Sequence, residues 1–156
     1  MHSFKIIPEE ELVVQILKGD ITLEDFLSGM GHLTSDSRFN PAFSSVMDFR
    51  QGRVLMSLDD LKNAGERFRE MDCCKGRRAL LVNRSVDTAK ILIFRCHTGA
   101  GERFSVYSTV EGASTFLLND LSRFLEEDVV REDLYIDSQS GGTRSSDPLR
   151  DPSNLS

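Results

Sequence analysis

The residues best placed to do chemistry surround Ser57, which precedes a segment whose apolar residues recur at helical spacing. A phosphate on a serine at a helix N-terminus would meet free backbone amides and the positive end of the helix dipole. Arg50 and Arg53 are close in sequence and could pair with that phosphate. Serine is also strongly preferred as an ordinary helix N-cap, and Asp59 and Asp60 already supply negative charge there. The pattern therefore leaves two interpretations of Ser57 open, a helix cap and a phosphorylation switch.

A second group of polar residues follows two apolar runs. Asp48 and Arg50 stand at the end of the run that begins near Ser45, and Asn83 and Ser85 follow the run from 78 to 82. In open α/β sheets, ligands bind outside the carboxyl ends of parallel strands. These four residues could line a small polar cleft at such an edge. Ordinary turn and capping roles are the alternative, because polar residues are expected in loops after strands.

Motifs for catalysis or metal binding are missing from the sequence. Cys73 and Cys74 have basic neighbours, which lower the pKa of a thiol, but no histidine is near them in sequence. Cys96 and His97 are adjacent, and side chains one position apart diverge on a helix. No nucleophile elbow, phosphate-binding P-loop or paired-histidine motif occurs. We therefore predict no catalytic residues, no metal and no cofactor, and hence a protein that is not an enzyme.

The composition of the chain limits the kinds of partner and the cellular compartment that we expect for the protein. The chain has 156 residues, 39% of them hydrophobic, which suits one domain with one main core. A net charge of -6 disfavours nucleic acid as a partner. No apolar run is long enough to span a bilayer, and the first residues lack the features of a signal peptide. Three cysteines, two of them adjacent, make a poor disulfide framework, so we expect a cytoplasmic protein.

Hydrophobic spacing predicts the element order β-β-α-β-α-β-α-β-α. The expected strands cover 4–7, 12–17, 45–49, 78–83 and 104–107. Each helix start carries a capping residue, and these are Thr22, Ser57, Ser85 and Ser108. The last helix is expected to carry apolar residues as far as Phe124. Alternating strands and helices imply right-handed crossovers, so the predicted class is α/β, with a mixed, mostly parallel sheet of about five strands and four helices.

The chain divides at an acidic run near residue 126. Residues 1–126 are expected to form the α/β domain. Residues 127–156 are acidic and rich in Ser, Gly and Asp, a composition typical of a mostly disordered extension. Within it, Leu134, Tyr135 and Ile136 form a short apolar piece that could dock on the domain.

Together with the element order, two short stretches carry a resemblance to a known group of proteins. They are Val46-Met47-Asp48, which ends the predicted central strand, and Thr109-Val110-Glu111-Gly112-Ala113, which opens the last helix. Over roughly residues 4–125, the chain resembles STAS-like domains, the group of bacterial anti-sigma-factor antagonists and their relatives, and more narrowly the uncharacterised single-domain branch. The resemblance implies the fold and a habit of binding protein partners.

In the antagonists, a partner kinase phosphorylates a serine at the start of the second helix, within an Asp-Ser-Ser-Gly-like turn. The corresponding stretch here is Met56-Ser57-Leu58-Asp59. Met56, Leu58 and Asp59 stand where the family pattern has Asp, Ser and Gly. Ser57 alone is retained, and it lies one position before the usual phosphorylated serine.

These observations lead to one main functional hypothesis and two alternatives. The main one is a non-enzymatic regulatory or protein-interaction module, whose partner contacts the loop from Arg50 to Met56 and the start of the second helix; a homodimer is one assembly that it allows. The first alternative is a small carrier of an apolar or lipid-like ligand, suggested by two apolar helix faces, Leu23/Phe26/Met30 and Phe116/Leu121/Phe124. An enzyme ranks third, because only residues distant in sequence could assemble its site.

Overall fold

A computed structural model describes residues 1–72 and 75–126 of the chain. Within these residues, five strands form one mixed sheet in the order β1-β2-β4-β6-β7. β1 pairs antiparallel with β2, and every other neighbouring pair in this sheet is parallel. The strands are β1 (His2–Ile7), β2 (Leu12–Leu17), β4 (Ser44–Asp48), β6 (Arg78–Leu81) and β7 (Phe104–Tyr107).

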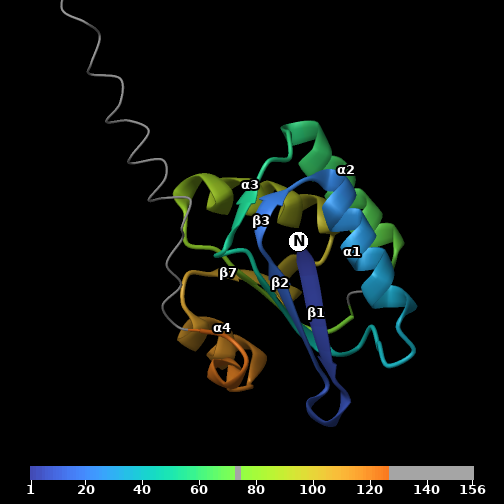
Figure 1. Ribbon diagram of the computed structural model, residues 1–156, viewed down its shortest axis with the longest axis vertical. Helices are drawn as coiled ribbons and strands as arrows, with labels where there is room; N and C mark the ends of the chain where they lie inside the picture. Colours follow the sequence, from blue (N-terminus) through green and yellow to red (C-terminus); the bar gives the residue numbers. More distant parts are fainter. Residues whose placement is uncertain (73–74, 127–156) are drawn as a thin grey trace, which may run out of the picture.

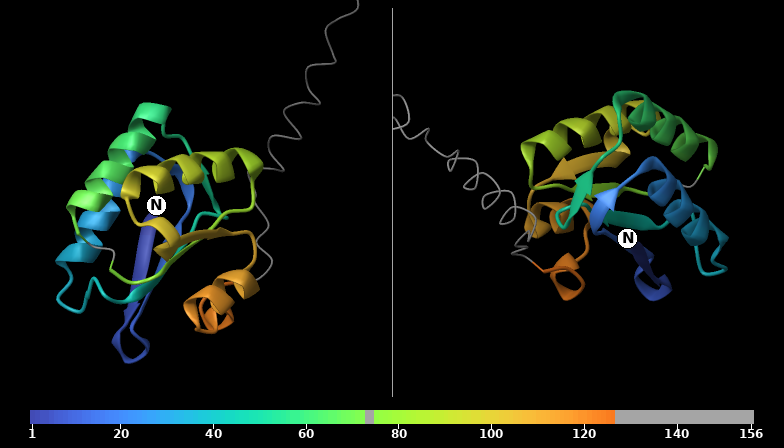
Figure 2. Two further views of the ribbon diagram at one scale, coloured as in Figure 1. Left: turned by 180° about the vertical axis from the view of Figure 1, so that it is seen from behind. Right: turned by 45° about the horizontal axis from the view of Figure 1, so that its top comes forward.

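Helices cover both faces of the sheet (Figures 1 and 2). The described residues contain four α-helices: α1 (Leu23–Ser35), α2 (Leu58–Glu70), α3 (Ser85–Thr98) and α4 (Val110–Leu117). Single 3-10 turns lie at η1 (Pro8–Glu10), η2 (Gly101–Arg103) and η3 (Leu121–Arg123). This architecture confirms the predicted α/β class, with its mixed sheet of five strands and its four helices.

Alternation along the strands divides the interior into two apolar cores. Met47 and Leu80 belong to the core beneath α1, α2 and α3, whereas Val46 and Leu81 belong to the core beneath α4. Successive side chains on a strand point to opposite faces, so an unbroken apolar run supplies both cores. Because β2, β4, β6 and β7 run parallel, their carboxyl ends meet at one edge of the sheet.

A small second sheet was not predicted from the sequence. β3 (Gly19–Ile21) and β5 (Gly52–Val54) pair in parallel. Three-residue strands show no usable periodicity, and both begin with glycine, so the sequence suggested loops there. At Gly52, a Cβ would lie 2.8 Å from the carbonyl oxygen of Leu17, so only glycine fits this close approach. β5 leads directly into the start of α2 and thereby fixes its position.

The predicted helix starts are correct for α1 and α2 and wrong for α3 and α4. Thr22 accepts a hydrogen bond from the Asp25 amide, as expected for a cap. α3 starts at Ser85 itself, with Arg84 in the N-cap position and no side-chain cap. The cap of α4 is Thr109, one position after the predicted serine. Capping patterns one residue apart satisfy similar amides, so local sequence does not distinguish them.

The last helix is also shorter than predicted. α4 ends at Leu117, and Leu118 has a left-handed backbone with φ of 54°. The chain then turns back, and the Leu121 amide donates a hydrogen bond to the Ser114 hydroxyl at 3.0 Å. Leu121 and Leu125, which follow this turn, are buried in the core beneath α4.

Two predictions fall outside the part of the chain that the structure describes. Cys73 and Cys74 lie in the gap, and the extension predicted for residues 127–156 follows the last described residue. Along the described ranges, none of the helices has the length and apolar character needed to cross a membrane.

Candidate functional site

Asp48 and Arg50 form a buried ion pair where β4 ends. The Arg50 Nε and backbone amide each donate to Asp48 Oδ1 at 2.9 Å, and Arg50 Nη2 donates to Asp48 Oδ2 at 2.8 Å. The exposed fractions are 1% for Asp48 and 2% for Arg50. These three bonds use most of the acceptor positions of the Asp48 carboxylate. The two charged groups that the sequence suggested as ligand-binding residues thus bind each other in the interior of the protein.

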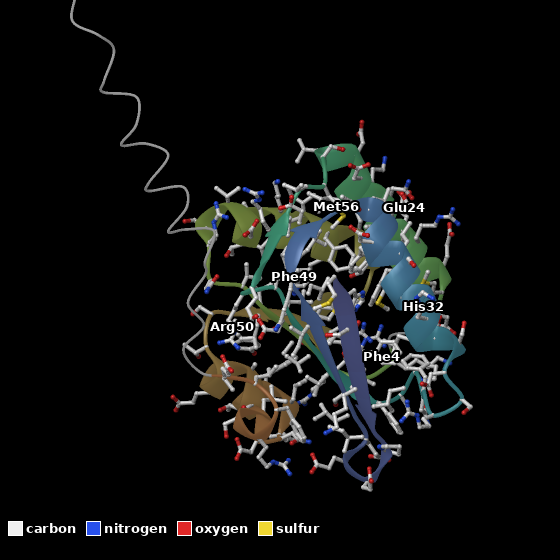
Figure 3. The ribbon with its side chains drawn as sticks, in the orientation of Figure 1. Phe4, Glu24, His32, Phe49, Arg50 and Met56 are labelled. Carbon is white, nitrogen blue, oxygen red and sulfur yellow. The ribbon has the colours of Figure 1, made fainter. Side chains whose placement is uncertain are left out.

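The end of the described chain covers this ion pair. Arg50 Nη2 donates to the carbonyl oxygen of Glu126 at 2.7 Å. Phe49 belongs to the core beneath α1, α2 and α3, whereas Arg50 lies on the side of α4 (Figure 3). The pair therefore ties the carboxyl end of β4 to the segment that follows η3. Asn83 and Ser85, by contrast, are exposed. Of the four residues predicted for a polar cleft, two are therefore buried and two are exposed.

Ser57 is an exposed helix cap. Its hydroxyl accepts a hydrogen bond from the Asp60 amide at 3.1 Å, and the Asp60 carboxylate accepts one from the Ser57 amide at 3.0 Å. These reciprocal bonds form a capping box. The capping interpretation of the sequence is therefore confirmed, while phosphorylation stays a prediction.

Arg53 has a partner on the small second sheet. Its guanidinium donates to Asp20 Oδ1 through Nη2 at 2.8 Å and through Nε at 3.0 Å. Asp20 and Arg53 face each other in the register of β3 and β5. Both side chains are roughly half exposed, at 54% and 42%, so solvent screens this pair. Each of the three charged residues predicted near Ser57, namely Asp48, Arg50 and Arg53, thus has an ionic partner elsewhere.

Two large apolar side chains are exposed on either side of Ser57. Leu55 is 48% exposed and Leu58 is 67% exposed, whereas Met56 between them is buried at 3%. Figure 3 shows Met56 at the end of the molecule where α2 begins. Large apolar patches at a protein surface are typical of sites that bind other proteins. We refer to Leu55, Ser57 and Leu58 as the α2 tip.

Sequence reasoning missed the residues that hold the α2 tip in place. Asp87, in the first turn of α3, is 2% exposed and accepts a hydrogen bond from the Val54 amide at 3.2 Å. Lys90 Nζ donates to the Val54 carbonyl at 2.6 Å. Arg84 lies 4.0 Å from the Asp87 carboxylate. An acidic residue in the first turn of a helix is common, so nothing in the sequence singled out this contact with β5.

A second polar group, made of partly buried His2 with buried Gln15 and Ser45, lies beneath α1 and was also missed. His2 Nε2 is 3.0 Å from Gln15 Oε1, and Gln15 Nε2 donates to Ser45 Oγ at 2.9 Å. The His2 ring stacks on Phe26 with 6.3 Å between centroids, and a Cβ at Gly29 would overlap the imidazole. Burial lowers the pKa of His2 from its ordinary value, although the bond to Gln15 opposes the shift.

The two apolar stripes that suggested a ligand carrier are used for packing. Phe26 and Met30 are 1% and 0% exposed in the core beneath α1, and Leu121 is 0% exposed in the other core. These three side chains fill the interior, whereas Phe124 of the second stripe is partly buried and lines a groove beside β1 and β2. Within the two described ranges, no cluster of three His, Cys, Asp or Glu side chains is arranged to hold a metal ion.

Comparison with known proteins supports the architecture. No family model matches the sequence, and no curated protein is similar to it. One solved structure is similar, that of an uncharacterised protein of the DUF3478 family with a SpoIIAA-like fold, from Shewanella loihica. The TM-score is 0.51 at 15% identity, and the match covers 75% of this chain and 92% of that one. The fold is SpoIIAA-like.

The SpoIIAA-like fold is the STAS-like fold, so the resemblance seen in the sequence is confirmed at the level of architecture. At 15% identity the comparison concerns the fold, and folds of this kind carry different functions on different surfaces. The function has to be argued from the chain's own residues, above all from the α2 tip.

Proposed function

We propose that this protein is a non-enzymatic regulatory module that binds a protein partner through the α2 tip. The exposure of Leu55 and Leu58, at 48% and 67%, carries the proposal. The tip is also held firmly, because Asp87 and Lys90 bind the backbone at Val54, the residue before Leu55. A rigid surface loses little conformational entropy on binding, which favours affinity.

The charged residues near this surface support a binding role over a catalytic one. Asp48 and Arg50 bind each other in the interior, and Arg53 binds Asp20. A catalytic acid or base must reach the atom from which it takes or to which it gives a proton. Asp48 and Arg50, which are buried and bound to each other, do not meet that requirement.

We further propose that charge at Ser57 regulates the partner. A phosphoryl group would add about two negative charges between the two exposed leucines, where an apolar partner surface would otherwise pack. It would also replace the hydroxyl that accepts from the Asp60 amide. Desolvating that charge beside Asp59 and Asp60 opposes binding, so phosphorylation is expected to release the partner.

The test is a quantitative pull-down from host lysate with the full chain immobilised. The double variant Leu55→Ser with Leu58→Ser should lose one specific partner. The matched control is Leu118→Asn, which removes a leucine that is 83% exposed at the far end of α4. Asparagine tolerates the left-handed backbone at that position. A partner retained equally by both variants would refute the α2 tip as the binding surface.

The regulatory role requires a separate pair of variants. Ser57→Asp and Ser57→Asn differ by one charge, and both residues are good N-caps, so α2 stays capped in each. Loss of the partner in Ser57→Asp alone would support a charge-sensitive interface. Equal binding by the two variants would leave the interaction surface in place and eliminate Ser57 as its switch.

A further inference from the structure

A groove lies on the α4 side of the sheet, beside β1 and β2. α4 itself packs over β4, β6 and β7, and among the described residues the other half of this face is covered where the chain returns after η3. The groove has a volume of about 280 Å³ and is lined by Ser3, Phe4, Lys5, Val14, Ile16, Arg123 and Phe124. Its floor is apolar, because Val14 and Ile16 belong to the core beneath α4 or pack against it.

Two cations flank the aromatic wall of this groove. Lys5 Nζ lies 5.6 Å and the Arg123 guanidinium 4.9 Å from the centroid of the Phe124 ring. Arg123 binds the Glu10 carboxylate through two bonds of 2.6 and 2.8 Å. Among the described residues, by contrast, Lys5 has no carboxylate within ion-pairing distance. The groove therefore suits an occupant that is apolar and carries a negative charge.

The chain itself supplies such a segment close by. Phe124 forms a wall of the groove, and the bond from Arg50 to the Glu126 carbonyl fixes the chain two positions later. The sequence then continues through Glu127, Asp128, Val129, Val130 and Arg131 to Glu132 and Asp133, which Leu134, Tyr135 and Ile136 follow directly. From residue 126 to residue 134 an extended chain reaches up to about 26 Å. Along β2, the floor from Val14 to Ile16 spans only about 7 Å.

We propose that residues 132–136 of this chain occupy the groove. Asp133 pairs with Lys5, and the apolar side chains of 134–136 cover Ile16 and Phe124. A short connection gives the segment an effective concentration on the order of millimolar, so few contacts suffice to keep it bound. This surface lies on the opposite side of the sheet from α2, and the inference is independent of the proposed function.

The test uses the full chain with a single fluorescent reporter. The sequence contains no tryptophan, so Tyr135→Trp introduces one at the proposed contact. Leu155→Trp is the matched control, near the end of the same extension and outside the proposed segment. We expect Tyr135→Trp to show blue-shifted emission and a severalfold smaller acrylamide quenching constant than Leu155→Trp. Equal quenching in the two variants would overturn the proposal.

A charge reversal then tests the location. Adding Lys5→Glu to Tyr135→Trp should raise the quenching constant to that of the Leu155→Trp control, and adding Asp133→Lys as well should lower it again. Protection that survives Lys5→Glu would refute the groove as the binding site. Protection that vanishes on dilution, with a dimer in analytical ultracentrifugation, would assign the segment to the groove of a second copy and overturn the intrachain contact.

Discussion

Removing the carboxylate of Asp48 should destabilise the protein severely. The change Asp48→Ala leaves the Arg50 guanidinium, which is 2% exposed, without the carboxylate that balances its charge. Breaking a buried ion pair in this way costs about 3–5 kcal/mol, since an uncompensated charge stays in the interior. Domains are typically stable by only about 5–15 kcal/mol, so this single change removes a large share of the free energy of unfolding.

The chain contains a matched control for this experiment. Asp36 and Arg38 have the same spacing and the same three bonds, from the backbone amide at 2.9 Å, from Nε at 3.0 Å and from Nη2 at 2.8 Å. They differ in burial, because their side chains are 21% and 59% exposed. Solvent screens this second pair, so Asp36→Ala should change stability far less than Asp48→Ala.

Urea unfolding followed by circular dichroism measures both variants, and an unchanged slope with denaturant concentration would show that only stability has changed. The double change Asp48→Leu with Arg50→Met should recover much of the loss, because apolar residues can replace a buried pair at little cost. Recovery should be partial, since the bond from Arg50 to the Glu126 carbonyl is lost as well. Equal losses for Asp48→Ala and Asp36→Ala would refute the reasoning that burial sets the cost.

Three further predictions test the helices and the buried polar group. Ser57→Ala should lower the free energy of unfolding by about 1 kcal/mol through loss of the cap, while Ser57→Asp should retain it, both measured by urea unfolding. Because the pKa of His2 is lowered in the folded state, its contribution to stability is complete above its ordinary pKa of 6.5 and is lost as the pH falls below that value. Thermal unfolding from pH 7.5 to 5 should show this loss in the wild type and much less of it in His2→Gln. Gly65→Ala should destabilise the protein, because the new Cβ would lie 2.8 Å from a backbone oxygen of α3. Gly31 has open space around it, so Gly31→Ala should stabilise α1 by up to about 1 kcal/mol. Equal melting temperatures for the two glycine variants would contradict this reasoning.

Local patterns account for the parts of the fold that the sequence predicted well. Ser57 and Asp60 are three positions apart, and the two bonds between them depend on little else. The apolar runs of β4 and β6 likewise predict buried parallel strands from their own composition. The sequence failed where an element is short, as in β3 and β5, and at the end of α4, where apolar residues continue at helical spacing past Leu117 although the helix does not.

The candidate site shows the same division. The sequence alone predicts that Ser57 is a helix cap or a phosphorylation switch and that Asp48 and Arg50 stand where the central strand ends. The tertiary structure determined which partners these charged side chains bind. Arg50 is 76 positions from the carbonyl of Glu126 that it binds, and Arg53 is 33 positions from Asp20. Arg50 is buried at the carboxyl edge of the sheet, and a guanidinium removed from water needs a carboxylate to balance its charge, which Asp48 provides. Only the folded chain determines which side chains are removed from water.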